Sequence, residues 1–460
     1  MHALADDAII WATQHGLVVG AGISTLPLAT IHAPLAVLPV PFPRASFQKA
    51  KDAMTIFNLV IDRISRDSTY LQQTLAAAAE YDDFTAKLLE VYRDNLALWQ
   101  SRASSELVLG IHRSDYMLDE PSSTLLQVEL NTIASSFGCL STLTGQMHRY
   151  ILERSDRPNT DPDCLPSNNA MNEIADAIGA AAREYGVDGA VALMVVQPGE
   201  RNAYDQQWIQ TTVWERHKVR MIRRTLREIS EQGQLSSSGR LSIAGHPIAV
   251  AYFRAGYSPT DYPSQAEWDA RGLLERSDAA QCPSVAYQLT GAKKIQQDLA
   301  RPGVLERFLD HPDQVRLLRA CFAGLWGLDD LDDPDTMAVL AEARTHPELF
   351  VLKPQREGGG NNLYGPQLLA KLDERRGLAA YILMQRIRPP SHRAAMIREG
   401  KVVEVDSLSE LGIYGTFLRR GDQVLLNRES GHLVRTKAST SDEGGVAAGF
   451  AVLDSPYLTD

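Results

Sequence analysis

A short apolar run at 349–352, LFVL, leads directly into the sequence KPQREGGGNNLYG at 353–365. Three consecutive glycines remove every Cβ from the turn and allow positive φ angles, so several backbone N–H groups can point at one anion. On its own such a stretch is more typical of a flexible surface turn. The Lys353 ammonium at the end of the predicted strand and the Glu357 carboxylate inside the loop favour a phosphate site, because a carboxylate can hold a phosphate-bound Mg²⁺. The two commonest phosphate-binding patterns, GxxxxGK[ST] and GxGxxG, do not match.

A second candidate feature is the alternation of apolar and polar residues over 126–131, LQVELN. This spacing predicts a strand whose Leu and Val side chains face the core, with Gln127, Glu129 and Asn131 on the other face. Residues two apart lie roughly 6.5–7 Å from each other on one face of a strand. Glu129 and Asn131 could therefore converge on a metal ion near a substrate phosphate, although a solvated outer face is the commoner meaning of such a pattern.

Several cations stand at the ends of apolar segments. Any one of them is most simply a surface ion-pair partner. Together they predict a site for several carboxylates and phosphates, because guanidinium groups grip such oxyanions in a bidentate fashion. These residues are Arg113, Arg254, Arg435, Lys293, Lys353 and Lys437.

The overall charge makes such a cationic site a local feature. Lys and Arg together number 46 against 57 Asp and Glu, which gives a net charge of −11. This balance argues against a nucleic acid or an anionic membrane as the main partner. No apolar stretch reaches the length of a transmembrane helix and no signal peptide is evident, so we expect a cytoplasmic protein. The four cysteines form no CxxC pair and indicate neither a disulfide framework nor a zinc site.

Hydrophobic periodicity predicts a chain of mixed helices and strands, long enough for two to four packed units. Helices are expected at 47–64, 84–99, 172–185 and 287–299. Strands are expected at 107–112, 123–131, 190–196, 349–354, 380–387, 401–417 and 423–427, with a hairpin at 240–254. The acidic, proline-rich segment at 154–169 is expected to be a surface connection.

Seven short motifs occur together in this chain. They are HRSDYM at 112–117, ERNAYDQ at 200–206, YFRAGY at 252–257, KPQREGGGNNLYG at 353–365, SELGIYG at 409–415, LVRTK at 433–437 and GGVAAG at 444–449. In this order they resemble the eukaryotic-type glutathione synthetases, a circularly permuted branch of the ATP-grasp ligases, from about residue 33 to the C-terminus. The resemblance implies an α/β (α+β) ATP-grasp fold with an inserted α/β substrate-binding subdomain and glycine-rich lid loops.

The resemblance also implies how the chain is divided. The N-terminal part of the ATP-grasp core, with a helical region and the metal-ligand strand, would span 1–189, and the substrate-binding subdomain 190–290. The ATP-binding region would span 291–460, with a lid at about 340–415 and a C-terminal Gly/Ala-rich loop.

Site residues follow by position. The resemblance implies an ATP site made of Glu129, Lys293, Lys353, Gly358, Gly359, Gly360, Asn361, Asn362, Tyr364, Met384, Gln385, Arg386, Ile387, Glu410 and Lys437. It implies metal ligands at Glu129, Asn131 and Glu357. It implies substrate contacts from Arg113, Ser135, Ser136, Glu200, Asn202, Gln206, Arg254, Tyr257, Arg435, Val446 and Ala447. Arg113, Arg435 and Lys353 are the expected catalytic groups.

The implied reaction is the ATP-dependent ligation of γ-glutamylcysteine and glycine to glutathione through an acyl phosphate, with two Mg²⁺ ions, in a cytoplasmic homodimer. Two alternatives stay open: a ligase that uses β-alanine, and a non-catalytic ATP-grasp module that binds nucleotide. Ala134 and Ala255 stand where the family usually has Ser and Asp, and either removes a polar contact. Either Asp442 or Glu443 could fill the acidic position of the last loop.

Overall fold

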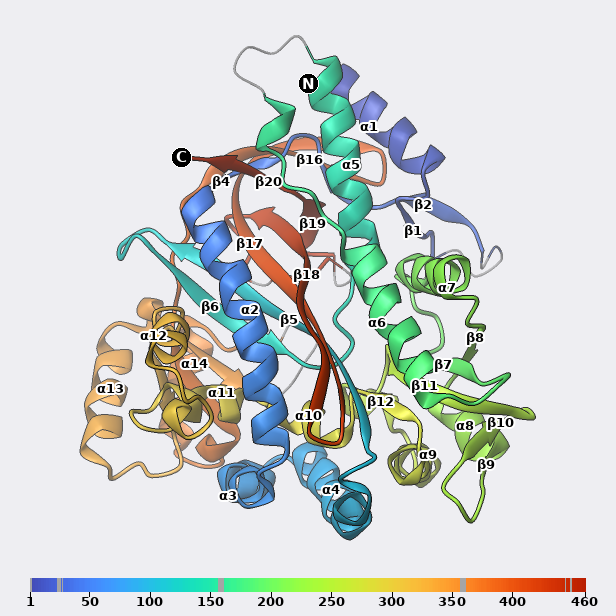
Figure 1. Cartoon of the computed structure of the whole chain (residues 1–460). Coiled ribbons are helices and arrows are strands. Elements are labelled where there is room, and N and C mark those ends of the chain that lie inside the picture. Colours follow the sequence, from blue (N-terminus) through green and yellow to red (C-terminus); the bar gives the residue numbers. More distant parts are fainter. Residues whose placement is uncertain are drawn as a thin grey trace.

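The computed structural model describes residues 2–22, 26, 28–155, 161–355, 361–442, 444–446 and 449–460. A large mixed sheet runs through the centre, with the helix α2 (Arg44–Ser65) on one side and α5 (Gly138–Arg154) and α6 (Ala170–Tyr185) on the other (Figure 1). The long strand β17 (Lys401–Arg420) shows why both faces are covered. Its Ile413 and Phe417 pack into the core beneath α2, and its Tyr414 and Leu418 pack into the core beneath α6.

The first part of this sheet is mostly antiparallel. The order runs from β16 (His392–Arg398) through β3 (Leu35–Ala36), β19 (Ala451–Asp454), β18 (Gln423–Ala438) and β17 to β5 (Leu107–Asp119), and on this path only the β3–β19 pair is parallel. Strand β6 (Thr124–Asn131) pairs antiparallel with the C-terminal half of β5. Beyond β5 the pairing becomes parallel, through β12 (Ala280–Cys282), β11 (His246–Phe253), β7 (Val191–Val195) and β8 (Met221–Arg224).

Shorter elements surround the sheet. A separate three-stranded sheet has the order β13 (Leu325–Gly327), β15 (Tyr381–Gln385), β14 (Phe350–Pro354). It packs against α13 (Pro334–Thr345) and α14 (Gly365–Glu374) in a core of its own. The remaining long helices are α1 (His2–Gln14), α3 (Ser68–Ala79), α4 (Asp83–Arg102), α7 (Ala203–His217) and α9 (Gln265–Arg276). No helix among the described residues is long and apolar enough to span a bilayer.

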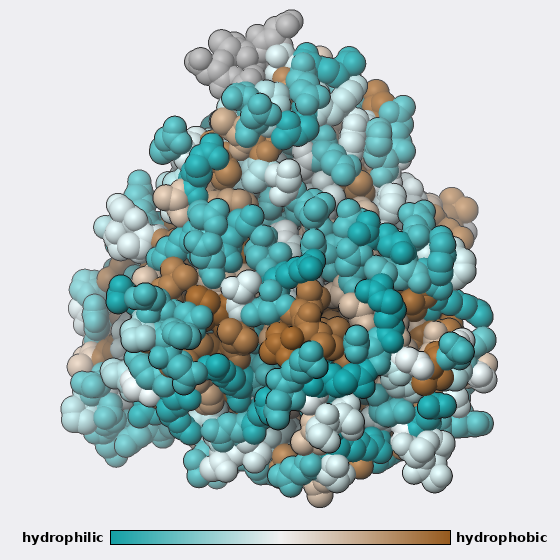
Figure 2. Space-filling view, viewed as in Figure 1, coloured by the Kyte–Doolittle hydropathy of each residue, from teal (hydrophilic) through white to brown (hydrophobic). Residues whose placement is uncertain are grey.

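The surface has a simple pattern on the face seen in Figure 1. Most of it is hydrophilic, and apolar residues show in patches near the centre and at a few places along the edges (Figure 2). The domain boundaries expected at 189 and 290 stay a prediction, since the strands of 190–290 continue the same sheet through the β5–β12 pairing.

One predicted helix is interrupted in the structure. The helix expected at 287–299 is two helices, α10 (Val285–Thr290) and α11 (Lys293–Ala300). The chain leaves the helical conformation at Ala292, whose ψ is 139°, and α11 begins at Lys293. The preceding residue, Gly291, passes so close to Thr132 that a Cβ there would lie only 2.3 Å from the Thr132 hydroxyl, which favours glycine.

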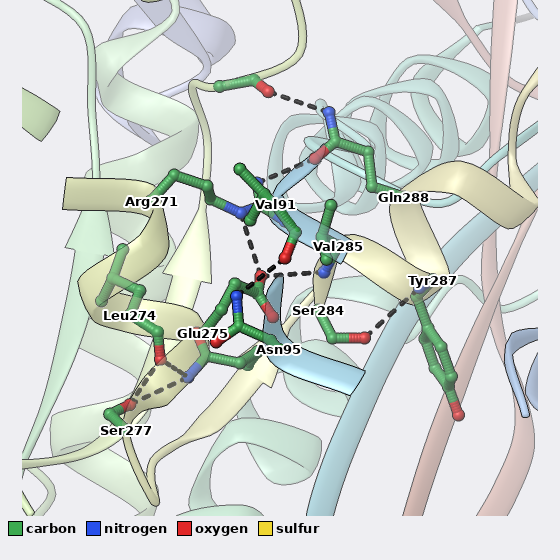
Figure 3. Close-up of polar contacts among 12 residues, drawn as sticks. Val91, Asn95, Arg271, Leu274, Glu275, Ser277, Ser284, Val285, Tyr287 and Gln288 are labelled. Atoms are coloured by element: carbon green, nitrogen blue, oxygen red, sulfur yellow. Dashed lines mark hydrogen bonds and ion pairs between the residues drawn. The ribbon is translucent and has the colours of Figure 1, made fainter. Parts of the chain in front are cut away.

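A buried network of hydrogen bonds connects α9 with α10 (Figure 3). The Arg271 Nε donates to Glu275 Oε1 at 3.0 Å, and its Nη1 donates to Gln288 Oε1 at 2.8 Å. The amide of Gln288 in turn donates to the carbonyl oxygen of Gly256 at 2.9 Å. The network therefore connects α9 and α10 to the YFRAGY segment, which begins with the last two residues of β11.

Candidate active site

A single cavity gathers residues from motifs that lie far apart in the chain. It is lined by strands of the large sheet on one side and by β14 and β15 on the other. The predicted site residues that line it are Arg113, Glu129, Asn131, Ser135, Ser136, Glu200, Asn202, Arg254, Tyr257, Lys293, Lys353, Asn361, Asn362, Tyr364, Met384, Gln385, Arg386, Ile387, Glu410, Arg435, Lys437 and Val446.

Two arginines that line this cavity meet on one buried carboxylate, that of Asp115, which does not line it. Arg113 donates through Nε to Asp115 Oδ1 at 2.6 Å and through Nη2 to Oδ2 at 2.8 Å. Arg435 donates through Nη2 to Asp115 Oδ2 at 2.9 Å and also contacts the Glu410 carboxylate. Strand geometry explains the meeting, because Arg113 and Asp115 are two apart on β5 and Arg435 faces Glu410 across the β17–β18 pair.

Asp115 is a site residue that the sequence reasoning missed. It is 1% exposed and takes a third donor, the Asn131 side-chain amide at 3.0 Å. Burial alone would lower the pKa of Arg113, but Asp115 raises that pKa well above its usual range. The signal for Asp115 was present in the sequence, since an acid two positions from an arginine on a strand shares its face.

A second cluster of charge surrounds Glu129. Its carboxylate lies 3.9 Å from the Lys293 ammonium, and the Lys353 ammonium donates to the Val128 carbonyl oxygen at 3.0 Å. Burial would raise the pKa of Glu129, but the charges of Lys293, Lys353, Arg435 and Arg113 outweigh it and hold that pKa at about 2. Glu129 is therefore ionised at any neutral pH.

Asn131 presents an oxygen beside this carboxylate. Its Nδ2 donates to Asp115 Oδ2 at 3.0 Å and to the Arg113 carbonyl oxygen at 3.3 Å. Both contacts need a donor, so they fix which way the amide faces and leave Oδ1 as the outward acceptor. No donor to that oxygen occurs among the residues that the structure describes.

The third member of the predicted polar face, Gln127, lies on the opposite face, so that prediction is wrong. A β-bulge at Val128 shifts the register, so Asp115 pairs with Glu129 but Tyr116 pairs with Gln127. The extra residue reverses the alternation. Gln127 is buried and donates to the Ser114 hydroxyl at 2.7 Å, on the side of the sheet away from the cavity.

At another end of the cavity, polar atoms are buried without partners. Arg254 donates through Nη1 to Asp205 Oδ2 at 3.1 Å. Asp205 also accepts from the backbone N–H groups of Phe137, at 2.9 Å, and Cys139, at 3.0 Å, at the start of α5. Within the described part of the chain, three buried atoms of the cavity wall have no hydrogen-bond partner: Ser135 Oγ, Asn202 Oδ1 and Arg254 Nε. Such atoms are costly to bury and indicate a polar ligand.

The side formed by β15 is more apolar. Met384 and Ile387 pack with Val351 in a small hydrophobic cluster beside the cavity. Val351, Met117 and Leu408 line the cavity as well, and the sequence reasoning missed these three because nothing distinguishes them from ordinary core residues.

Asp442 connects three parts of this side. Its carboxylate accepts from Arg386 Nη2 at 2.6 Å, and its carbonyl oxygen accepts from the Lys437 ammonium at 2.7 Å and the Tyr364 hydroxyl at 3.4 Å. Glu443, the other candidate for the acidic position, lies outside the described residues. Asp442 is thus an acid that demonstrably reaches the wall of the cavity.

Some predicted positions fall elsewhere. Gln206 is fully buried and does not line the cavity. Ala134 lines it and Ala255 is buried, each without the polar side chain usual in the resembling family. The predicted residues that lie outside the described part of the chain are Glu357, Gly358, Gly359, Gly360 and Ala447.

Comparison with known proteins decides the family. The family profile described as "Eukaryotic glutathione synthase, ATP binding domain" matches residues 1–458. The chain belongs to the eukaryotic glutathione synthase family. A relative named "Glutathione synthetase, chloroplastic" from Solanum lycopersicum is 49% identical, over 99% of this chain and 84% of that protein. The "Glutathione synthetase" of Homo sapiens is 42% identical, over 93% of this chain and 90% of that protein.

A solved structure supports the same fold for this member of the eukaryotic glutathione synthase family. It is an apo form of a "glutathione synthetase like-effector" from Globodera pallida, with a TM-score of 0.78 at 22% identity, over 99% of this chain and 96% of that chain. At that identity the likeness concerns the fold alone. The family and the α/β ATP-grasp fold predicted from the motifs are therefore confirmed, while the roles of single residues stay predictions.

Proposed function

We infer that this chain is a glutathione synthetase, an ATP-dependent ligase that joins γ-glutamylcysteine to glycine and releases ADP and phosphate. The observation that carries the inference is the cavity itself. It joins a cationic centre, made by Arg113, Arg435, Lys293 and Lys353, to a pocket of unpartnered polar atoms beside Arg254. Family membership and the high coverage of named glutathione synthetases support the same reaction.

Charge complementarity suggests how the dipeptide would lie. Its glutamyl end is an amino-acid zwitterion, so its ammonium needs a negatively charged partner and its carboxylate needs a positively charged one. Glu200 and Arg254 both line the same part of the cavity and supply those charges. The cysteinyl carboxylate would then extend toward Arg113 and Arg435, where carboxylate recognition by guanidinium is strongest.

The first step needs charge neutralisation more than it needs a protein nucleophile. An oxygen of the cysteinyl carboxylate attacks the γ-phosphorus of ATP, the bond to the β-phosphate oxygen breaks, and ADP leaves. We propose that Lys353, Lys293 and Lys437 stabilise the charge on the transferring phosphoryl group. The apolar wall of Met384, Ile387 and Val351 suits the adenine ring.

A magnesium site fits the described residues. Glu129 is ionised, and Asn131, two residues further along β6, turns its Oδ1 outward beside it. Mg²⁺ usually takes one or two carboxylates, with phosphate and water completing its shell. Among the described residues, no group of three or more Asp, Glu, His or Cys side chains could hold a metal ion. We propose Glu129, Asn131 and Glu357 as ligands for two Mg²⁺ ions, which would screen the phosphate charges when bound.

The second step is acyl transfer. The amine of glycine attacks the carbonyl carbon of the acyl phosphate, a tetrahedral oxyanion forms, and phosphate leaves as the peptide bond closes. We propose that Arg113 and Arg435 stabilise that oxyanion. Arg113 is held by Asp115 on two nitrogens, whereas Arg435 makes both of its described contacts through Nη2, so Nε and Nη1 remain for the substrate. A homodimer and a cytoplasmic location are further proposals. The first rests on the resemblance alone, and the second is the expectation from the sequence given above.

The proposal is tested by incubating the purified chain with ATP, Mg²⁺, γ-glutamylcysteine and glycine. We expect one ADP for each glutathione, measured by coupled ADP assay and by mass spectrometry. β-Alanine in place of glycine should react at least about tenfold more slowly, since a site that fits glycine would have to accommodate an extra methylene. A preference for β-alanine would favour the alternative acceptor. A folded protein that binds ATP without any ligation would favour the non-catalytic module.

A further inference from the structure

We propose that Arg223 is a positioning residue for the dipeptide: it fixes the side-chain amide of Gln206 so that this amide donates to the α-carboxylate of the glutamyl group. The proposal rests on the function inferred above. Arg223 does not line the cavity and belongs to none of the predicted site motifs. It lies on β8, in the arginine-rich segment MIRR at the edge of the parallel strands.

The surroundings of Arg223 are unusual for a cation. The guanidinium Nη2 donates to Gln206 Oε1 at 2.6 Å, and Nη1 approaches the Met194 sulfur at 3.5 Å. No carboxylate forms an ion pair with it in the described part of the chain. Burial and then the neighbouring charge of Arg254 lower its pKa, while Glu200 raises it. Two cations are thus held near each other in a partly buried place, an arrangement that a bound anion stabilises.

The contact with Arg223 decides which way Gln206 faces. A guanidinium group only donates hydrogen bonds, so the atom of Gln206 nearest to it must be the oxygen. The nitrogen Nε2 is then the remaining group, and it is buried without a partner among the described residues. A buried donor without an acceptor is unfavourable, and it suits a ligand that brings one.

Helix geometry relates that donor to the cavity. Gln206 lies four positions after Asn202, at the start of α7, so both side chains are on one face of the helix. Asn202 lines the cavity and has an unpartnered Oδ1, and Arg254, the residue directly after β11, lines it with an unpartnered Nε. Gln206 does not itself line the cavity, so the shared face with Asn202 is what places its Nε2 toward the ligand in this proposal. Arg254 and Gln206 would then both donate to one carboxylate, and the Arg223 guanidinium on the amide oxygen would add positive charge.

The test compares four variants in steady-state assays. Arg223→Met removes both the charge and the amide contact, and we expect the KM for γ-glutamylcysteine to rise about tenfold or more, with KM for ATP and kcat within about threefold. Arg223→Lys, which can still donate to Gln206 Oε1, should restore part of this loss. Gln206→Glu keeps an acceptor for Arg223 but has no donor for the substrate, so its KM should rise at least as much.

Arg224→Met is the matched control. Arg224 is the next residue on β8 and donates to Gln232 Oε1 and to the backbone carbonyl oxygen of Arg223. It makes no described contact with the Arg223 side chain or with Gln206, so its replacement should leave every parameter unchanged. A second control uses the substrate 4-aminobutanoyl-cysteine, which lacks the α-carboxylate. Wild type and Arg223→Met should handle it equally, because the group that they distinguish is absent.

The outcomes separate the two proposals. If the wild type is active and Arg223→Met has an unchanged KM for the dipeptide, the role of Arg223 is overturned while the proposed function stands. An equal rise in the KM for ATP and for the dipeptide would also overturn that role, because it would indicate general damage. Wild type that forms no glutathione overturns the proposed function and this inference with it. If Arg223→Met does not fold, Gln206→Glu with a wild-type KM is the result that contradicts the inference.

Discussion

Replacing Arg435 with alanine should lower kcat roughly 100-fold, because one preorganised donor to a developing oxyanion typically contributes that much. Arg435 is one of two guanidinium groups on Asp115, and its side chain is only 15% exposed. Arg113 alone would remain to balance Asp115 and Glu410 and to face the reacting carbonyl. The loss should appear in kcat more than in the KM for ATP, since the interaction strengthens in the transition state. Initial-rate kinetics with each substrate varied in turn measure both.

Arg428 offers a control on the same strand. It lies seven residues before Arg435 on β18, and its side chain is 60% exposed and pairs with Glu173 at 3.6 Å. Arg428→Ala removes an arginine from β18 without touching the cavity, so its kcat should stay at the wild-type value. A folded Arg435→Ala protein with kcat within threefold of wild type would remove Arg435 from the catalytic groups.

Among substitutions that keep the shape of the side chain, Glu129→Gln should be the most damaging. We expect the activity at low Mg²⁺ to fall about 100-fold and the Mg²⁺ concentration that gives the half-maximal rate to rise tenfold or more. The four cations around Glu129 keep its carboxylate ionised, with a pKa of about 2. Glutamine keeps the shape but removes the charge, so the affinity for a divalent ion falls. The rate as a function of Mg²⁺ at fixed ATP is the decisive measurement.

The matched change is Glu120→Gln, in the turn that joins β5 to β6. Glu120 is exposed, and its described hydrogen bonds are made by its backbone. This variant should show the wild-type Mg²⁺ dependence. If Glu129→Gln shares that dependence, Glu129 is not a metal ligand and the carboxylate serves only to balance the lysines.

Much of this architecture was predictable from local patterns. The 3.6-residue spacing of apolar side chains from Phe47 to Ile64 predicts α2, which spans Arg44–Ser65. The apolar run before Lys353 predicts β14, and the motifs bring most site residues to one cavity. These features depend on periodicity and on short stretches of chain, which a sequence displays directly.

The errors have a tertiary origin. Alternation predicted Gln127 beside Glu129, but the bulge at Val128 arises from pairing with β5, which no local pattern encodes. The break between α10 and α11 lies at Ala292, whose ψ of 139° leaves the helical region, and the apolar periodicity did not mark it. The spacing of Arg113 and Asp115 could have indicated their shared face, but the contact of Asp115 with Arg435 joins strands that are distant in the sequence. The bulge and this contact both require knowledge of which strands meet.

Transfer of oxygen from the dipeptide to phosphate tests the central claim most directly. The cysteinyl carboxylate of γ-glutamylcysteine is labelled with ¹⁸O on both oxygens, and the phosphate released during ligation to glycine is analysed by mass spectrometry. If the carboxylate attacks ATP to form an acyl phosphate, each phosphate carries one ¹⁸O and each glutathione keeps the other. Glutathione formed together with unlabelled phosphate, or ADP released with no glutathione at all, would contradict the mechanism.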